Sequence, residues 1–224
     1  MIRVEKANPD KINIDISEVV RYLGYGKMVP DLETVSAIKK YIGELKPKLS
    51  LKAVYDCFDV SVSEKDVNIS GIMNIESMNL AKNLKGCEKI ILFAATLGIE
   101  PDRLLYRLSC TSPHDAVIVQ AIGTVAIEEW CNILCDKLGD EMKCNGYFLR
   151  PRFSPGYGDF SITSQKQIFN ILDCGRKIGL TLTDSCMMVP GKSVTAVIGL
   201  SGENLHCGKQ GCEFCNKKDC SFRR

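Results

Sequence analysis

The residues best suited to hold a small ligand lie in one short segment, Arg-Phe-Ser-Pro-Gly-Tyr, at positions 152–157. Pro155 followed by Gly156 predicts a type II turn, because proline presets φ at the second position and glycine supplies the positive φ required at the third. Glycine also lets the backbone approach a ligand closely. Arg152 offers a fork of donors for a carboxylate, and Tyr157 offers a ring and a hydroxyl. The segment is a candidate site for a small zwitterion with an aromatic base, and the alternative is an ordinary surface turn.

A second set of chemically capable residues is a C-terminal tail with four cysteines, namely Cys207, Cys212, Cys215 and Cys220. Four thiolates so close in sequence predict one metal centre, against the alternative of a free or disulfide-bonded tail. The Cys-x4-Cys-x2-Cys spacing matches three ligands of plant-type iron–sulfur proteins, and the surrounding basic residues would offset the charge of a cluster. We therefore favour [4Fe–4S]. Zinc is the alternative, although zinc sites favour two Cys-x2-Cys pairs, and His206 is an alternative ligand.

Other suggestive patterns do not support chemistry. Gly191-Lys192-Ser193 lacks the glycine that a phosphate loop needs five residues earlier, where Cys186 stands, and a strand is predicted to follow. The chain has only 2 histidines, so a Ser-His-Asp or Cys-His centre has little support. The cysteines outside the tail lie mostly among apolar neighbours and are interpreted as core residues.

The spacing of apolar residues predicts a mixture of helices and strands. Helices are expected over 31–45, 75–84, 102–108, 112–138 and 163–178, and strands over 52–62, 88–97 and 194–200. Asp31 and Ser112 are predicted N-caps, and Gly86, Gly139 and Gly179 are predicted to end helices. Because strands and helices do not alternate regularly, the predicted class is α+β.

The bulk composition restricts the class of protein. A net charge of +2 over 224 residues argues against a nucleic-acid binder. The longest apolar run, residues 90–99, is too short to span a bilayer, and the N-terminus has no hydrophobic signal region. We therefore expect a cytoplasmic protein with no membrane partner.

The segment 152–157, followed by Gln165 and by Leu-Thr-Asp-Ser-Cys-Met-Met-Val-Pro-Gly-Lys-Ser-Val at 182–194, resembles the activation domain of cobalamin-dependent methionine synthase. The resemblance implies an α+β fold with a twisted, largely antiparallel sheet flanked by helices. The chain is similar to a free-standing form of this domain, with an S-adenosylmethionine (SAM)-binding domain over 1–205 and a Cys-rich metal-binding tail over 206–224. The tail departs from the fused form of the family.

The resemblance also implies a ligand site for SAM. Arg152 would bind the methionine carboxylate, Ser154, Pro155 and Gly156 would supply backbone contacts, and Tyr157 would pack against the ligand. Glu128, preferred over Glu129 from the small residues that precede it, would offset the positive charge of SAM. Ser154 stands where the family often has alanine. An acidic residue near the N-terminus also contributes in the family, and the sequence does not locate it here.

The implied function is the reductive reactivation of a cobalamin-dependent methyltransferase by SAM-dependent methylation of cob(II)alamin. No catalytic residue is assigned, since the chain would act as an accessory subunit that places two cofactors. The chain lacks the Asp-x-His-x-x-Gly pattern that supplies a lower ligand to cobalt, so cobalamin would be carried by the partner, methionine synthase or another corrinoid protein. A flavodoxin or ferredoxin would be the low-potential electron donor. The alternatives are an iron–sulfur electron-transfer module and a zinc-stabilised chaperone for a corrinoid protein.

Overall fold

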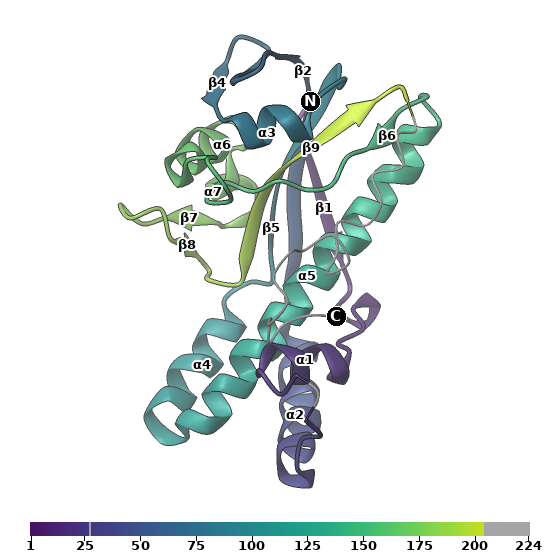
Figure 1. Ribbon diagram of the computed structural model, residues 1–224. Coiled ribbons are helices and arrows are strands. Elements are labelled where there is room, and N and C mark those ends of the chain that lie inside the picture. The colour runs from purple at the N-terminus through teal and green to yellow at the C-terminus, as the bar shows by residue number, and fades with distance from the viewer. Residues whose placement is uncertain (27, 204–224) are drawn as a thin grey trace.

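A computed structural model describes residues 1–26 and 28–203 and shows helices packed on both faces of an antiparallel sheet (Figure 1). The sheet has the order β4-β3-β2-β5-β9-β6, with β1 pairing to β2. A separate hairpin is formed by β7 and β8. The predicted α+β class with a largely antiparallel sheet is confirmed.

The strands of the main sheet are β1 (Arg3–Ala7), β2 (Leu51–Val62), β3 (Asp66–Ile69), β4 (Met73–Glu76), β5 (Lys89–Thr96), β6 (Phe148–Leu149) and β9 (Ser193–Ser201), and those of the hairpin are β7 (Thr181–Leu182) and β8 (Met188–Val189). The α-helices are α1 (Ile16–Tyr22), α2 (Leu32–Leu45), α3 (Met78–Asn83), α4 (Glu100–Thr111), α5 (Pro113–Lys143), α6 (Gln165–Leu172) and α7 (Cys174–Ile178). The short 3-10 helices are η1 (Pro9–Lys11), η2 (Lys46–Lys48) and η3 (Ile162–Ser164).

Strand β5 forms the centre of the fold and separates two apolar cores. Side chains alternate along a strand, so Ile91 and Phe93 face a core shared with α1, α2, α4 and α5, whereas Ile90 and Leu92 face a core shared with α3, α6 and α7. All four side chains are at most 1% exposed. The predicted central strand over 88–97 is therefore confirmed.

Helix α5 crosses the first face of the sheet and packs against α1, α2 and α4. In Figure 1, α1, α2 and α4 gather around its N-terminal half at the lower end of the view, and α3, α6 and α7 lie beside the upper part of the sheet. Among the described residues, α5 is the helix long and apolar enough to cross a membrane, but 61% of its most apolar stretch is buried inside the fold. Packing in the core accounts for its apolar character.

Several predicted elements agree with the structure. Helix α2 begins after Asp31, whose carboxylate accepts a hydrogen bond from the amide of Thr34 at 2.7 Å. Strands β2 and β9 coincide with the predicted strands within one residue at each end. Gly179 ends α7 with φ of +72°, a left-handed conformation that favours glycine. Helix caps and the alternation of apolar residues along strands are local sequence signals, and at these positions the folded structure agrees with them.

Other predicted boundaries were wrong. Gly139 does not end α5, which continues to Lys143, because Leu138 and Met142 still pack against the core and offset the roughly 1 kcal/mol that a helical glycine costs. Ile75 belongs to β4 rather than to a helix, since it pairs with Val67 in a hairpin that the sequence did not reveal.

The remaining differences concern helix lengths and unpredicted elements. The helix predicted over 163–178 is two helices, because Asp173 adopts φ of +51° between α6 and α7. The short helix predicted over 102–108 extends over Glu100–Thr111. The elements α1, β1, β3, β4, β6, β7 and β8 were not predicted.

Candidate ligand site between α1, α5 and the Arg152 segment

The backbone after β6 directs Arg152 toward α5. The amide of Arg150 donates to the Gly199 carbonyl at 2.8 Å, and Phe153 exchanges two hydrogen bonds of 2.9 Å with Val197 of β9. Residues 150–153 therefore extend the sheet beside β9. Since neighbouring side chains point to opposite faces, Phe153 packs on the core of α3, α6 and α7 while Arg152 reaches the face covered by α5.

Arg152 is held by three side chains from α5. Its Nη2 donates to Glu128 Oε2 at 3.0 Å and to Asn132 Oδ1 at 3.1 Å, and its Nη1 lies 3.8 Å from Cys135 Sγ. Glu128 and Asn132 are four residues apart and thus lie on the same side of the helix. The Arg152 side chain is 23% exposed, and that of Glu128 is 47% exposed. A partly buried guanidinium is thereby fixed beside a carboxylate that solvent or a ligand can still reach.

The electrostatics around Arg152 keep its charge. Burial by itself disfavours the protonated guanidinium, but the negative charges of Glu128 and, at the high pH where they ionise, of the Cys131 and Cys135 thiolates outweigh it, so the pKa of Arg152 lies above its ordinary value. Burial raises the pKa of both thiols, although Arg152 partly opposes this. Arg152 is therefore a permanent cation, and the two cysteines are neutral neighbours rather than nucleophiles.

Arg152 borders a hollow of about 480 Å³, within the range of small-molecule sites. The hollow lies between α5 and the N-terminal segment around α1, and its lining is Asn13, Asp15, Glu18, Tyr22, Val125, Glu128, Glu129, Asn132 and Arg152. Of these described side chains, four are acidic and one is a guanidinium. Arg21 pairs with Glu18 at 2.7 Å and Arg152 pairs with Glu128 at 3.0 Å. The carboxylates of Asp15 and Glu129 exceed these two ion pairs, so the hollow has net negative charge and suits a ligand with net positive charge.

Asp15 is a lining residue that the sequence analysis missed. It is the N-cap of α1, and its Oδ1 accepts a hydrogen bond from the amide of Ser17 at 2.8 Å. The cap pattern Asp15-Ile-Ser before the apolar Val19 could have indicated this helix. Only the packing of α1 against α5 brings Asp15 to the same hollow as Glu128.

The predicted turn is present, but it does not line this hollow. The amide of Tyr157 donates to the Ser154 carbonyl at 3.2 Å, and Gly156 has φ of +93°, as a type II turn requires. Pro155 is buried, and Tyr157 is 68% exposed. The structure thus brings Arg152 and Glu128 together, whereas residues 154–157 follow as a separate exposed turn just beyond Arg152.

The remaining predicted site residues are in the tail. Cys207, Cys212, Cys215 and Cys220, the alternative ligand His206 and the domain division after residue 205 lie outside the described residues. Within residues 1–26 and 28–203, no group of three or more His, Cys, Asp and Glu side chains could hold a metal ion. Ser193 begins β9, so a strand rather than a helix follows Gly-Lys-Ser, as predicted.

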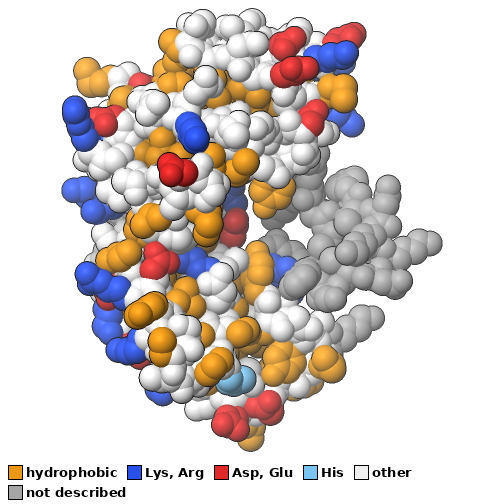
Figure 2. Space-filling view, turned by 90° about the vertical axis from the view of Figure 1, so that its left-hand side faces the viewer, with side chains coloured by type: hydrophobic (Ala, Val, Ile, Leu, Met, Phe, Trp, Pro, Cys, Tyr) orange, Lys and Arg blue, Asp and Glu red, His pale blue; other side chains and the backbone are white. Residues whose placement is uncertain are grey.

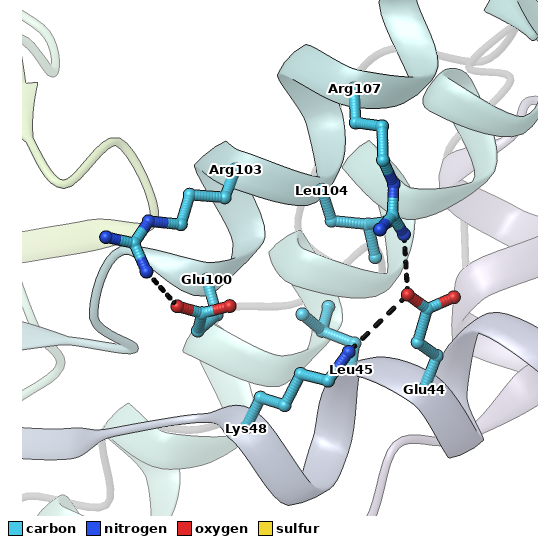
Figure 3. A pocket seen from close by; sticks show the side chains of 7 residues that line it. All are labelled: Glu44, Leu45, Lys48, Glu100, Arg103, Leu104 and Arg107. Atoms are coloured by element: carbon cyan, nitrogen blue, oxygen red, sulfur yellow. Dashed lines mark hydrogen bonds and ion pairs between the residues drawn. The ribbon is translucent and has the colours of Figure 1, made fainter. Parts of the chain in front are cut away.

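A second hollow, of about 300 Å³, lies between α2 and α4 and is shown in Figure 3. Glu44 accepts from Arg107 at 2.6 Å and from Lys48 at 3.5 Å, and Glu100 accepts from Arg103 at 2.7 Å. Both carboxylates that line it are therefore already paired with cations. We interpret this groove as an ion-pair network that joins α2 to α4 rather than as a ligand site.

The fold and the hollow together define an α+β domain that presents a ligand-sized, mainly acidic site beside its longest helix. Residues 116–206 match the family model described as "Vitamin B12 dependent methionine synthase, activation domain". A solved structure described as "Crystal Structure of the MetH Reactivation Domain bound to AdoHcy" is similar, with a TM-score of 0.66 and 15% sequence identity over 89% of this chain and 78% of that chain. A comparison with curated proteins gave no match. The predicted resemblance is confirmed, because residues 116–206 of this chain are similar to the activation domain of vitamin B12-dependent methionine synthase.

Proposed function

We propose that this chain binds SAM at the hollow beside Arg152 and donates the SAM methyl group to a cobalamin held by another protein, reactivating a cobalamin-dependent methionine synthase. The observation that carries the proposal is the Arg152–Glu128 pair, a fixed cation and a reachable carboxylate at the edge of an acidic hollow. Two similarities support it, namely the family match over residues 116–206 and the likeness of the fold to a reactivation domain solved with AdoHcy.

Each residue of the proposed site has a role that follows from its chemistry. The carboxylate of SAM would take charge-assisted hydrogen bonds from Arg152. Glu128, half exposed, would turn toward the ammonium or sulfonium group, and Asp15 would add a second carboxylate. SAM has a net positive charge when its amine and sulfonium are cationic and its carboxylate is anionic, so the excess of carboxylates favours it.

The exposed turn would complete the ligand contacts. Ser154, Pro155 and Gly156 would offer backbone groups, because Gly156 has no side chain to cover its own backbone. Tyr157, 68% exposed, would pack its ring against the aromatic part of the ligand. Since the turn lies outside the hollow of Arg152, the ligand would extend from the hollow toward the turn.

The reaction needs placement more than acid–base chemistry. Cob(II)alamin, one electron from a low-potential donor and SAM give methylcobalamin and S-adenosylhomocysteine. The cobalt of the partner supplies the nucleophile for this step. The residues of this chain bind and orient the sulfonium and move no proton, so their contribution is proximity and orientation.

The partner would approach a hollowed face of the molecule. Figure 2 shows apolar side chains bordering a depression between the upper and lower parts of one face, with acidic and basic side chains beside one another within it. Such a surface suits a bulky amphipathic partner such as a protein-bound corrin. We further propose that the four tail cysteines bind a [4Fe–4S] cluster or zinc, and that a flavodoxin or ferredoxin supplies the electron.

The test has two stages. Calorimetry with SAM measures binding first. Transfer of labelled methyl from SAM to cobalamin is then followed with a methionine synthase that lacks its own activation domain, loaded with cob(II)alamin, in the presence of a low-potential reductant. We expect label on cobalamin that depends on this chain and on Arg152. SAM binding without transfer to that synthase or to other corrinoid proteins would refute reactivation, and absence of SAM binding would refute the ligand site.

A further inference from the structure

Asp159, two residues beyond Tyr157, fastens the exposed turn to a distant part of the chain. Its carboxylate accepts hydrogen bonds from the hydroxyl of Ser77, from the amide of Met78 at 2.8 Å and from the amide of Asn79 at 3.1 Å. These donors lie about 80 residues earlier, at the start of α3. Ser77 is itself 2% exposed and caps α3 by accepting from the amide of Leu80 at 3.0 Å. Asp159 is therefore bound to the capped start of α3 by three hydrogen bonds, one of them from the buried Ser77.

The segment between the turn and Asp159 closes on itself. The amide of Gly156 donates to the Phe160 carbonyl at 2.7 Å, and the amide of Phe160 donates to the Tyr157 carbonyl at 3.0 Å. Phe160 is 1% exposed and stacks on Phe153 with ring centroids 6.2 Å apart. One side of this closed segment is thus held in the core by Phe160, and the other is held on α3 by Asp159.

Gly158 shows that the contact with α3 is close. It has φ of +57°, and a Cβ at this position would lie 2.6 Å from Nδ2 of Asn79. A side chain at position 158 would therefore meet Asn79 in addition to adopting a disfavoured backbone conformation. The glycine allows the backbone of residues 157–159 to lie directly on the start of α3, where Asp159 meets its three donors.

We infer that Asp159 is a positioning residue for the ligand turn, fixing Gly156 and Tyr157 in the orientation that the ligand meets. This inference rests on the proposed function for its ligand and on the geometry above for the contact itself. Hydrogen bonds from Ser77 and from the amides of Asn79 and Met78 hold the pKa of Asp159 below its ordinary value, so the carboxylate remains charged at neutral pH. The ionised form is also the one that can accept all three hydrogen bonds.

The experiment measures amide hydrogen exchange and SAM binding in four proteins, the wild type, Asp159→Asn, Asp159→Ala and Asp31→Ala. Asp31 is the matched control, because its carboxylate also accepts from a helix N-terminal amide, at the start of α2. We expect the amides of Gly156 and Tyr157 to exchange at least about tenfold faster in Asp159→Ala, since a charged hydrogen-bond acceptor is lost. Asp159→Asn, which retains one acceptor oxygen, should be intermediate, and Asp31→Ala should leave these amides unchanged.

SAM affinity should follow the same order. We expect Asp159→Ala to weaken SAM binding about tenfold and Asp31→Ala to leave it unchanged, even if the two variants lose similar thermal stability. Unchanged exchange at Gly156 and Tyr157 in Asp159→Ala would overturn the inference, as would faster exchange with unaltered SAM affinity. If the wild type itself failed to bind SAM, the proposed function would fail, and the exchange data would still decide whether Asp159 holds the turn.

Discussion

Replacing Arg152 with alanine should weaken ligand binding strongly while changing stability little. Arg152 donates to Glu128 and Asn132, and among the described residues it is the cation that lines the hollow. If the SAM carboxylate takes its charge-assisted hydrogen bonds, their loss costs about 1.5–3 kcal/mol. The Kd for SAM should then rise by a factor of about 10 to 150.

The effect on folding should be much smaller. The Glu128 side chain is 47% exposed, so solvent screens its ion pair with Arg152, and the pair contributes at most about 1 kcal/mol to the free energy of unfolding. Loss of the partly buried aliphatic stem of Arg152 removes a few packing contacts and lowers the stability slightly further. For a chain of this size, about 1 kcal/mol corresponds to a change in Tm of about 2–4 °C. Arg152→Ala should therefore melt cooperatively, a few degrees below the wild type.

The assay is calorimetric titration with SAM alongside thermal denaturation. Arg103→Ala is the matched control, since Arg103 pairs with Glu100 at 2.7 Å outside the proposed site and its loss should leave the Kd unchanged. Glu128→Gln keeps an acceptor for Arg152 but removes a charge, so it should weaken SAM binding less than Arg152→Ala. An unchanged Kd in a folded Arg152→Ala variant would show that the ligand site has been assigned to the wrong residues.

Three further predictions concern other parts of the chain. Gly156→Ala should lower the free energy of unfolding by about 1–2 kcal/mol in chemical denaturation, because alanine is disfavoured at φ of +93° and its Cβ would lie 3.2 Å from Ile162; an unchanged midpoint would contradict this. Burial lowers the pKa of Lys192 from its ordinary value of 10.5 to about 8, so between these two pH values unfolding takes up a proton. The free energy of unfolding of the wild type should therefore rise with pH across this window relative to that of Lys192→Met, and parallel pH curves of the two proteins would refute this. Truncation after Gly202 should retain a cooperative melt and SAM binding while abolishing bound iron or zinc, measured by elemental analysis; metal that survived would exclude the tail as its site.

The local signals in the sequence were strong where one residue determines the backbone. The carboxylate of Asp31 determines the start of α2, and the pair Pro155-Gly156 determines a type II turn. The continuous apolar run of β5 predicts a buried central strand in any environment that excludes water. These predictions succeeded because their physical causes act within a few residues of chain.

The signals failed where distant parts of the chain compete for the same residues. The residues around Ile75 have a spacing that predicts a helix. In the structure, however, Ile75 pairs with Val67 in the hairpin of β3 and β4, and the hydrogen bonds between these strands decide its conformation. Glycine often ends a helix, but α5 continues past Gly139 because Leu138 and Met142 still pack against the core. In both cases contacts with distant parts of the chain outweigh the local preference.

For the candidate site, the sequence by itself determined the residue types, and the tertiary structure decided their partners. The motif around Arg152 predicted a carboxylate-binding arginine followed by an open turn, and the family resemblance favoured Glu128 on the long helix. Only the pairing of Phe153 with Val197 directs Arg152 to Glu128, and only the packing of α1 on α5 adds Asp15 to the same hollow. Likewise, the contact of Asp159 with α3 joins positions about 80 residues apart. Such contacts depend on the order of strands and the path of the chain between them, which no local pattern of residues specifies.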